Sequence, residues 1–298
     1  MTGGTLPASA GIGRIGLTVE TIDETVAFYR DVVGLTVHAR DAEAATLGTP
    51  DEALLELRAE PDCPPRPGTA AGLFHTAFRV PTRGALADAL DRVREEWELS
   101  GASDHLVSEA LYLRDPEGNG VEIYRDRDRS EWPTTDEGRV AMVTDPLDLA
   151  ALASEATGTG TVPVGSDVGH VHLEVTDLPT ARRFYADALG MNVRQEMSGA
   201  LFLAAGEYHH HVGCNVWNGR STPAKGRGLD WFEVVVPADA VGGVRERVET
   251  AGFETGGAEG GGGPGGRGHA EVEPTDHDGF AVSDADGVEL RVRPAREV

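Results

Sequence analysis

The chain carries the same sequence pattern twice, and this duplication limits its possible folds more than any other feature. Residues 16–34 read GLTVETIDETVAFYRDVVG, and residues 172–190 read HLEVTDLPTARRFYADALG. In each copy a Tyr follows the Val of the first segment by ten residues, and a Gly follows the Tyr by five. Val19 and Val175 are 156 residues apart. The pattern indicates two homologous halves.

A second pair of segments repeats at the same separation. In FHTAFRVP and WFEVVVP, the Val before the Pro is Val80 and Val236, again 156 residues apart. The closing segments are DPEGNGVEIY, which contains Glu122, and DADGVELRV, which contains Glu289. They are separated by 167 residues. The difference of 11 indicates a loop insertion, which we assign to the glycine-rich run GGAEGGGGPGGRG.

Each half divides into two units of similar layout. A half-buried strand is followed by a helix that begins at Thr, Asp or Pro and ends at Gly, and short strands separated by turns come next. The halves span residues 11–127 and 165–296, joined by a linker at 128–164 that includes a predicted helix around PLDLAALASEA. The four predicted modules are residues 11–62, 70–127, 165–220 and 226–296.

Charge and composition exclude several classes of protein. The chain has 50 acidic and 26 basic residues, and Lys225 is its only lysine. A net charge of −24 disfavours binding to nucleic acid or to anionic membranes, and we interpret it as an acidic surface of the halophilic type. Two cysteines form no disulfide framework, and no segment resembles a signal peptide or a membrane span. We therefore expect a cytoplasmic protein.

The repeated unit, its FY…LG signature and the closing GVE strand resemble the vicinal oxygen chelate superfamily of glyoxalases, extradiol dioxygenases and bleomycin-resistance proteins. The resemblance covers nearly the whole chain. It implies an α+β fold in which four βαβββ modules form two cup-shaped sheet barrels with helices outside. Within the superfamily, four modules in one chain are typical of two-domain ring-cleaving enzymes of the catechol 2,3-dioxygenase kind, or of fused glyoxalases.

The resemblance also indicates metal ligands. His75 and His170 each lie five residues before the Val that ends their strand, which is the family's first-strand ligand position. Strand alternation places His170 and His172 on one face, towards the cup. At the duplicated positions stand Arg14 and Trp231, which bind neither iron nor zinc.

Carboxylates at the family's closing-strand position complete the set. Glu122 and Glu289 match this position, whereas module three has Gly213 there, with Asn215 nearby, and module one offers Glu56 at best. The resemblance therefore implies a two-histidine, one-carboxylate site that suits Fe(II), or Mn(II), formed by His75, His170 and Glu122. Such a site requires modules two and three to meet, either within one chain or between the chains of a dimer.

Acid–base residues are expected beside the metal. The stretch YHHHVG at residues 208–213 resembles the family's RHHT-like stretch, which makes His210 the proton carrier. Strand alternation would turn His209 and His211 to the opposite side. If the register slips by one residue, His209 or His211 takes the role instead.

Module two carries a further match in SDHLVSEALYLRDPEGNGVEIY. The resemblance implies that His105 hydrogen-bonds a substrate oxygen. Tyr112 either contacts substrate or is a core aromatic. His172 either contacts substrate or is only a hydrogen-bonded residue of the cup. His277 echoes His105 in module four, where we expect no second site.

The expected function is that of an extradiol dioxygenase, which uses Fe(II) to add both atoms of O₂ beside the hydroxyls of a small aromatic diol. One alternative is a glyoxalase-type isomerase or lyase, although Gly213 stands where its second closing-strand carboxylate would be. Another is a non-enzymatic binding protein of the resistance type. The assembly state, monomer or homo-oligomer, stays open.

Overall fold

The computed structural model describes residues 5–135, 140–257 and 279–295. Most of the glycine-rich run, as well as His277, lies outside these described residues. The described chain forms two large mixed sheets with a few helices, so the predicted α+β fold is confirmed. No helix of this part of the chain is long and apolar enough to cross a membrane.

The first sheet has eight strands. In spatial order they are β15 (Thr255–Gly256), β16 (Phe280–Ser283), β17 (Glu289–Pro294), β14 (Gly228–Val236), β1 (Gly11–Val19), β4 (Ala53–Ala59), β3 (Ala44–Gly48) and β2 (Thr36–Arg40). At its centre β1 of module one pairs antiparallel with β14 of module four. This sheet therefore joins the outer two modules of the chain.

The second sheet has nine strands. In spatial order they are β11 (Asn192–Met197), β12 (Ala200–Ala204), β13 (Val212–Asn215), β10 (Asp167–Glu174), β5 (Gly72–Arg79), β8 (Gly120–Asp126), β7 (Ser108–Arg114), β6 (Gly101–Asp104) and β9 (Asp145–Pro146). Here β10 of module three pairs antiparallel with β5 of module two. Modules two and three thus meet within one chain, as the predicted ligand set requires.

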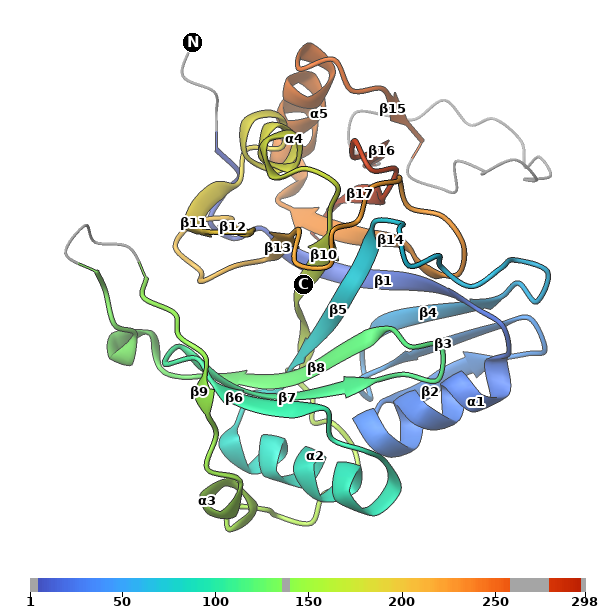
Figure 1. Cartoon of the computed structure of the whole chain (residues 1–298), viewed down its shortest axis with the longest axis vertical. Helices are drawn as coiled ribbons and strands as arrows, with labels where there is room; N and C mark the ends of the chain where they lie inside the picture. The colour runs from blue at the N-terminus through green and yellow to red at the C-terminus, as the bar shows by residue number, and fades with distance from the viewer. Residues whose placement is uncertain (1–4, 136–139, 258–278, 296–298) are drawn as a thin grey trace.

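Helices cover the outer faces of the sheets. They are α1 (Ile22–Ala27), which continues into the π-helical turn η1 (Phe28–Val33), α2 (Arg83–Glu96), α3 (Leu149–Ala153), α4 (Leu178–Arg182) with its π-helical turn η3 (Arg183–Ala188), and α5 (Val241–Thr250). Short 3₁₀ turns η2 (Arg129–Glu131) and η4 (Ala238–Ala240) complete the set. Figure 1 shows α1 and α2 on one side of the molecule and α4 and α5 on the other.

The linker between the halves is partly structured. It contains the predicted helix, α3, which is capped by Asp148: the carboxylate accepts hydrogen bonds from the backbone N–H groups of Ala150 and Ala151. It also supplies β9, the edge strand that pairs with β6. The linker therefore extends the sheet that contains modules two and three.

The duplication is visible in the core contacts. Tyr29 of η1 and Tyr185 of η3 are fully buried, and each donates its hydroxyl to a carboxylate: Tyr29 to Asp115, before β8, and Tyr185 to Asp284, before β17. Both carboxylates lie at the start of the turn before the closing strand, where they accept backbone N–H groups of that turn. The two halves therefore use the same tyrosine–aspartate pair to fasten a helix to a turn.

These turns correct the expected alignment of the closing strands. The N–H of Asp115 is bonded to the carbonyl of Asn119 and that of Asp284 to the carbonyl of Val288, so the equivalent positions are 169 residues apart rather than 167. Matching the letters GVE was therefore wrong by two residues. The structural equivalent of Glu122 is Arg291, because hydrogen bonds in the turn, not shared letters, fix the register of the strand that follows.

Candidate metal centre and active site

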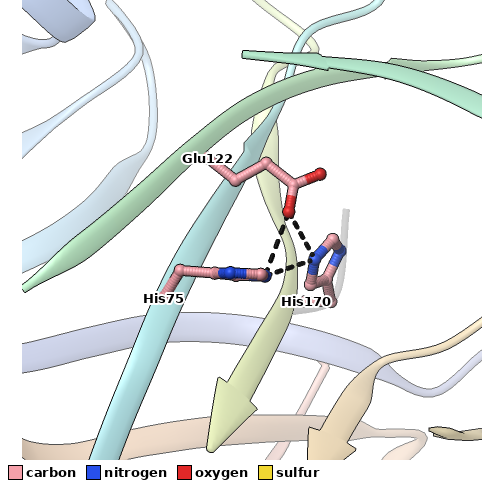
Figure 2. A group of neighbouring side chains, drawn as sticks. All are labelled: His75, Glu122 and His170. Atoms are coloured by element: carbon pink, nitrogen blue, oxygen red, sulfur yellow. Dashed lines mark hydrogen bonds and ion pairs between the residues drawn. The ribbon is translucent and has the colours of Figure 1, made fainter. Parts of the chain in front are cut away.

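Three side chains converge at the centre of the nine-stranded sheet. His75 comes from β5, Glu122 from the neighbouring β8 and His170 from β10 on the other side of β5. Glu122 Oε2 lies 3.0 Å from His75 Nε2 and 3.2 Å from His170 Nε2. The two imidazole Nε2 atoms are 3.2 Å apart. Figure 2 shows all three side chains pointing at one another, as predicted from the sequence.

These separations fit a divalent metal. Three ligands at right angles, with bonds of about 2.1 Å, have donor atoms about 3.0 Å apart, which is the spacing along one face of an octahedron. All three residues are buried, and within the described residues they are the group of potential ligands whose donor atoms lie within 4.8 Å of one another. Burial lowers the pKa of His170 to about 4, so its Nε2 carries a lone pair at neutral pH. The residues present thus fit Fe(II) or Mn(II).

The group opens into a cavity of about 470 Å³. One end of the cavity is lined by the three candidate ligands together with other polar residues, and the remaining wall is mostly apolar, with contributions from Val107, Met142, Met197, Phe202 and Trp217. The half-exposed Trp217 packs near His172, with ring centroids 5.4 Å apart. A flat apolar ligand can therefore reach the ligand group with one edge while its body contacts this wall.

His105 and Tyr112 line the cavity as a hydrogen-bonded pair. The Nδ1 atom of His105 lies 2.6 Å from the carbonyl oxygen of Val143, which can only accept, so Nδ1 carries the proton. In the neutral ring Nε2 then accepts the hydroxyl of Tyr112, 2.6 Å away. Burial and the nearby Glu122 carboxylate raise the pKa of Tyr112 well above its ordinary value, which keeps this hydroxyl protonated.

His172, for which the sequence leaves two roles open, lies at the wall of the cavity. Its Nε2 accepts a hydrogen bond from the side-chain nitrogen of Asn215, 3.1 Å away. Asn215 itself is fully buried. His172 is therefore fixed at the cavity wall with its ring beside His75, at a centroid distance of 4.9 Å.

The histidine triplet differs from the sequence expectation in one respect. Residues 209–211 lie in the loop between β12 and β13, not in a strand, so alternation does not apply. His209 and His210 do not face opposite sides; their Nδ1 atoms are 2.8 Å apart. His210 nevertheless lines the cavity, with its ring centroid 4.1 Å from that of His170. His211 instead accepts the backbone N–H of Ala205.

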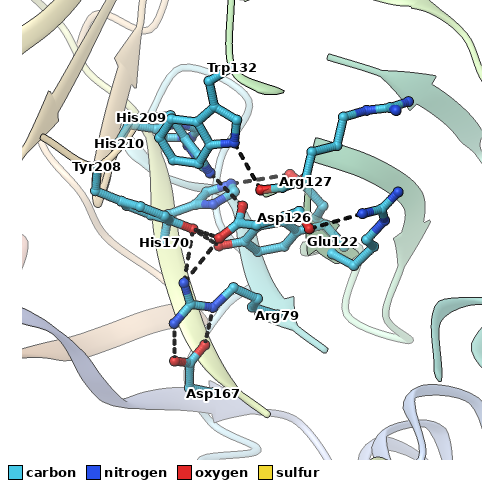
Figure 3. A network of polar contacts seen from close by, with 12 residues as sticks. Arg79, Glu122, Asp126, Arg127, Trp132, Asp167, His170, Tyr208, His209 and His210 are labelled. Atoms are coloured by element: carbon cyan, nitrogen blue, oxygen red, sulfur yellow. Dashed lines mark hydrogen bonds and ion pairs between the residues drawn. The ribbon is translucent and has the colours of Figure 1, made fainter. Parts of the chain in front are cut away.

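Asp126 is a residue of this site that the sequence reasoning missed. It lies on β8 four residues after Glu122, so strand alternation places it on the same face, and that spacing is the signal that could have identified it. Its carboxylate contacts Arg79, Tyr208 and His209 at 2.9–3.0 Å. Figure 3 shows Asp126 at the centre of this polar network behind the candidate metal centre.

The equivalent region of the eight-stranded sheet holds an ion-pair network. Arg14 takes the position of His170, and its guanidinium donates to Glu233 and to Glu56. Trp231 takes the position of His75 and lies beneath the guanidinium of Arg291, 4.1 Å from the ring centroid. Two permanently charged arginines thus occupy the positions that hold a candidate ligand histidine and the candidate ligand glutamate in the other sheet.

Comparison with known proteins agrees with this architecture. The model of the Glyoxalase/Bleomycin resistance protein/Dioxygenase superfamily matches residues 11–123 and 167–284. A catechol-2,3-dioxygenase of Bacillus subtilis (strain 168) is 39% identical over 252 residues, covering 81% of this chain and 88% of that protein. The resemblance seen in the sequence is therefore confirmed at the level of the family.

Two solved structures share the fold. A putative dioxygenase from Bacillus subtilis subsp. subtilis str. 168 has a TM-score of 0.61 at 12% identity, with 99% of this chain and 87% of that chain covered. A glyoxalase I mutant from Zea mays has a TM-score of 0.60 at 16% identity, with 96% and 94% covered. With the duplicated modules and the family match, they lead to one conclusion: the chain belongs to the glyoxalase/bleomycin resistance protein/dioxygenase superfamily.

Proposed function

We propose that the chain is an extradiol ring-cleaving dioxygenase that acts on a catechol-type diol with Fe(II) and O₂. The observation that carries the proposal is the buried His75–Glu122–His170 group at the polar end of an otherwise apolar cavity. Three protein ligands on one face leave coordination positions open, where bound Fe(II) would hold the diol oxygens and O₂. Mn(II) suits the same ligands.

The roles of the surrounding residues follow from their hydrogen bonds. His210 borders the cavity beside the ligand group and is placed to take a proton from the diol and return it later. Tyr112 donates to His105, so the lone pairs of its hydroxyl are free to accept a hydrogen bond from a substrate hydroxyl. The apolar wall orients the aromatic ring and excludes water from the diol.

The cavity also favours a substrate without a charged substituent. No lysine or arginine is among the described residues that line it, and its wall is rich in methionine, valine and aromatic side chains. A carboxylate substituent would lose its hydration there without gaining a cationic partner. We therefore propose catechol or an alkyl- or aryl-substituted catechol as the substrate. The relative from Bacillus subtilis, named a catechol-2,3-dioxygenase, supports this choice.

The glyoxalase-type alternative is disfavoured by the position of Gly213. This residue pairs with His172 in the sheet, and a Cβ at this position would lie 2.9 Å from the imidazole of His172. The site therefore has no room for a second closing-strand carboxylate unless His172 moves. In the other sheet the equivalent position is Glu56, which pairs with Gly16.

The test is O₂ consumption under defined metal loading. The chain is purified anaerobically, loaded with Fe(II) and mixed with catechol or methylcatechols, and O₂ uptake is followed with the absorbance of the yellow ring-opened product. Glu122→Gln should abolish both signals, whereas the same substitution at Glu289, in the other sheet, should retain them. Turnover of a glutathione hemithioacetal, without O₂ uptake on any catechol, would refute the proposal in favour of a lyase.

A further inference from the structure

Asp126 and His209 form a hydrogen-bonded chain that ends on His210. We propose that these two residues are positioning residues that hold His210 in one tautomer, with the proton on Nδ1 and the lone pair of Nε2 available to the cavity. The catalytic meaning of this arrangement rests on the proposed function. The tautomer itself is a property of the protein without metal or substrate.

The geometry of the chain is continuous. Asp126 Oδ1 lies 2.9 Å from His209 Nε2, and His209 Nδ1 lies 2.8 Å from His210 Nδ1. His209 is almost fully buried between Tyr208 and Trp132, with ring centroids 4.0 and 5.3 Å away. The imidazole of His209 therefore cannot turn to exchange these partners without moving both aromatic side chains.

The direction of each hydrogen bond follows from what its partners can do. An ionised carboxylate only accepts, so His209 must donate from Nε2. A neutral His209 then has a lone pair on Nδ1, and the short contact with His210 requires His210 to donate from its own Nδ1. Neutral His210 is left with an unprotonated Nε2. Without this contact, the imidazole of His210 could carry its proton on either nitrogen.

Asp126 is held in the ionised form that this order requires. Burial raises the pKa of its carboxyl, but the hydrogen bond from His209 and the guanidinium of Arg79 outweigh burial and lower the pKa overall. Tyr208 and Arg79 also donate to Asp126. The carboxylate of Asp126 therefore keeps two other hydrogen-bond donors if the hydrogen bond from His209 is lost.

For the proposed reaction, the tautomer decides whether His210 can act as a base. A substrate hydroxyl can give its proton only to an unprotonated nitrogen that faces the cavity. With the opposite tautomer, His210 would present an N–H to the cavity and would first have to lose it. Asp126 and His209 thus act through His210 and need not contact substrate themselves.

Two substitutions of His209 separate this role from a packing role. The side-chain oxygen of asparagine can take the place of Nδ1, so His209→Asn keeps an acceptor for His210 and loses the contact with Asp126. The amide of glutamine reaches the place of Nε2, so His209→Gln keeps the contact with Asp126 and loses the acceptor for His210. The two variants thus remove opposite ends of the chain.

The first readout is nitrogen NMR of the metal-free chain labelled at the imidazole nitrogens. Wild-type His210 should show a protonated Nδ1 and an unprotonated Nε2. His209→Asn should keep this signature, and His209→Gln should shift it towards the other tautomer. His211 is an internal reference, because accepting the N–H of Ala205 at Nδ1 gives it the opposite tautomer. A protonated Nε2 on His210 in the wild type would overturn the proposal.

The second readout is turnover of the Fe(II)-loaded chain on catechol. Hydrogen-bond partners of metal-ligating histidines typically contribute about 10- to 100-fold to metal affinity or activity, and we expect His209→Gln, which removes such a partner from His210, to lower kcat by a similar factor with iron content and KM unchanged. His209→Asn should lose less, and the control His211→Gln should lose nothing. Equal turnover of wild type and His209→Gln would refute the positioning role. If the wild type consumes no O₂ but shows the expected tautomer, only the proposed function fails.

Discussion

Replacing Arg14 by methionine tests whether the ion pairs of the eight-stranded sheet stabilise the fold without affecting metal binding in the nine-stranded sheet. The guanidinium of Arg14 donates to Glu233 at 2.8 and 3.2 Å and also to Glu56. Glu233 retains only 6% of its side-chain exposure, whereas Glu56 retains 38%. The Arg14→Met variant therefore leaves one buried carboxylate without its closest partner and one accessible carboxylate that water can solvate.

The expected loss of stability can be estimated from these exposures. Breaking a buried ion pair by removing one partner costs about 3–5 kcal/mol, and an exposed pair is worth about 0–1 kcal/mol. Arg14 is 28% exposed, and the carboxylate of Glu233 keeps the backbone N–H of residue 14 and has Arg293 3.6 Å away. We therefore expect Arg14→Met to lower the free energy of unfolding by about 2–3 kcal/mol.

The assay is urea unfolding of the metal-free chain at constant salt, with bound iron measured separately. The double variant Arg14→Met/Glu233→Met should recover to within about 1 kcal/mol of the wild type, because apolar replacement of a buried pair is often neutral. Both variants should bind iron as the wild type does. Glu122→Gln should bind little iron and should lose the stabilisation by metal, which is about 2.7 kcal/mol at a free concentration 100 times Kd.

Two results would refute this reasoning. An unfolding free energy of Arg14→Met within about 0.5 kcal/mol of the wild type would mean that Glu233 does not depend on the guanidinium. Loss of iron from Arg14→Met, at a stability that leaves the chain folded, would mean that the two sheets are not independent in metal binding.

Three further predictions concern Asp115, Gly169 and Trp217. Burial raises the pKa of Asp115 to about 6, above its unfolded value, so its contribution to stability is present below pH 4 and is lost as the pH rises through 6. Between pH 4 and 7, the free energy of unfolding of Asp115→Asn, measured in urea, should therefore rise by about 2–3 kcal/mol relative to that of the wild type. A difference between the two proteins that does not change with pH would contradict this. A Cβ at Gly169 would lie 1.8 Å from the hydroxyl of Tyr124, whose ring centroid is 4.9 Å from that of His170. Gly169→Ala should therefore displace Tyr124 against His170 and lower the iron content, and removing the hydroxyl in Gly169→Ala/Tyr124→Phe should restore part of it. Full iron content in Gly169→Ala would argue against this contact. Trp217→Ala should raise KM for catechol about 10-fold with little change in kcat, because contact with the indole contributes about 1–1.5 kcal/mol to binding an aromatic ring. Steady-state O₂ uptake measures both constants, and an unchanged KM would exclude contact between Trp217 and the substrate.

The sequence predicts the candidate ligands well because they lie on strands in a duplicated framework. Alternation assigns the faces of a strand, and the repeat supplies a second copy against which each position can be compared. The resemblance marks His75 and His170 as candidate ligands because each lies five residues before the Val that ends its strand, and the structure brings both to Glu122. The pairing of modules two and three follows from the ligand positions that the resemblance implies, since only that pairing joins two histidines to a carboxylate at those positions.

The errors arose where one-dimensional pattern and backbone geometry differ. The triplet at residues 209–211 reads as a strand, but the backbone makes a loop there, and the contact between His209 and His210 depends on that loop. The letters GVE aligned Glu289 with Glu122, whereas the turn hydrogen bonds align Arg291 with it. A shift of two residues keeps the same face of the strand and moves a side chain by about 7 Å, so alternation could not reveal the error.

The two sheets differ in how the charge of a buried carboxylate is balanced. In the eight-stranded sheet, the guanidinium of Arg14 forms an ion pair with the buried carboxylate of Glu233, so a side chain of the protein balances this charge. In the nine-stranded sheet, Glu122 faces two imidazoles instead, and the low pKa of His170 leaves that ring neutral. A neutral imidazole cannot balance the carboxylate, but its lone pair points to the same place as the carboxylate oxygen. This arrangement suits the proposed metal ion, because a cation that is not tethered to the chain leaves further coordination positions open to a substrate.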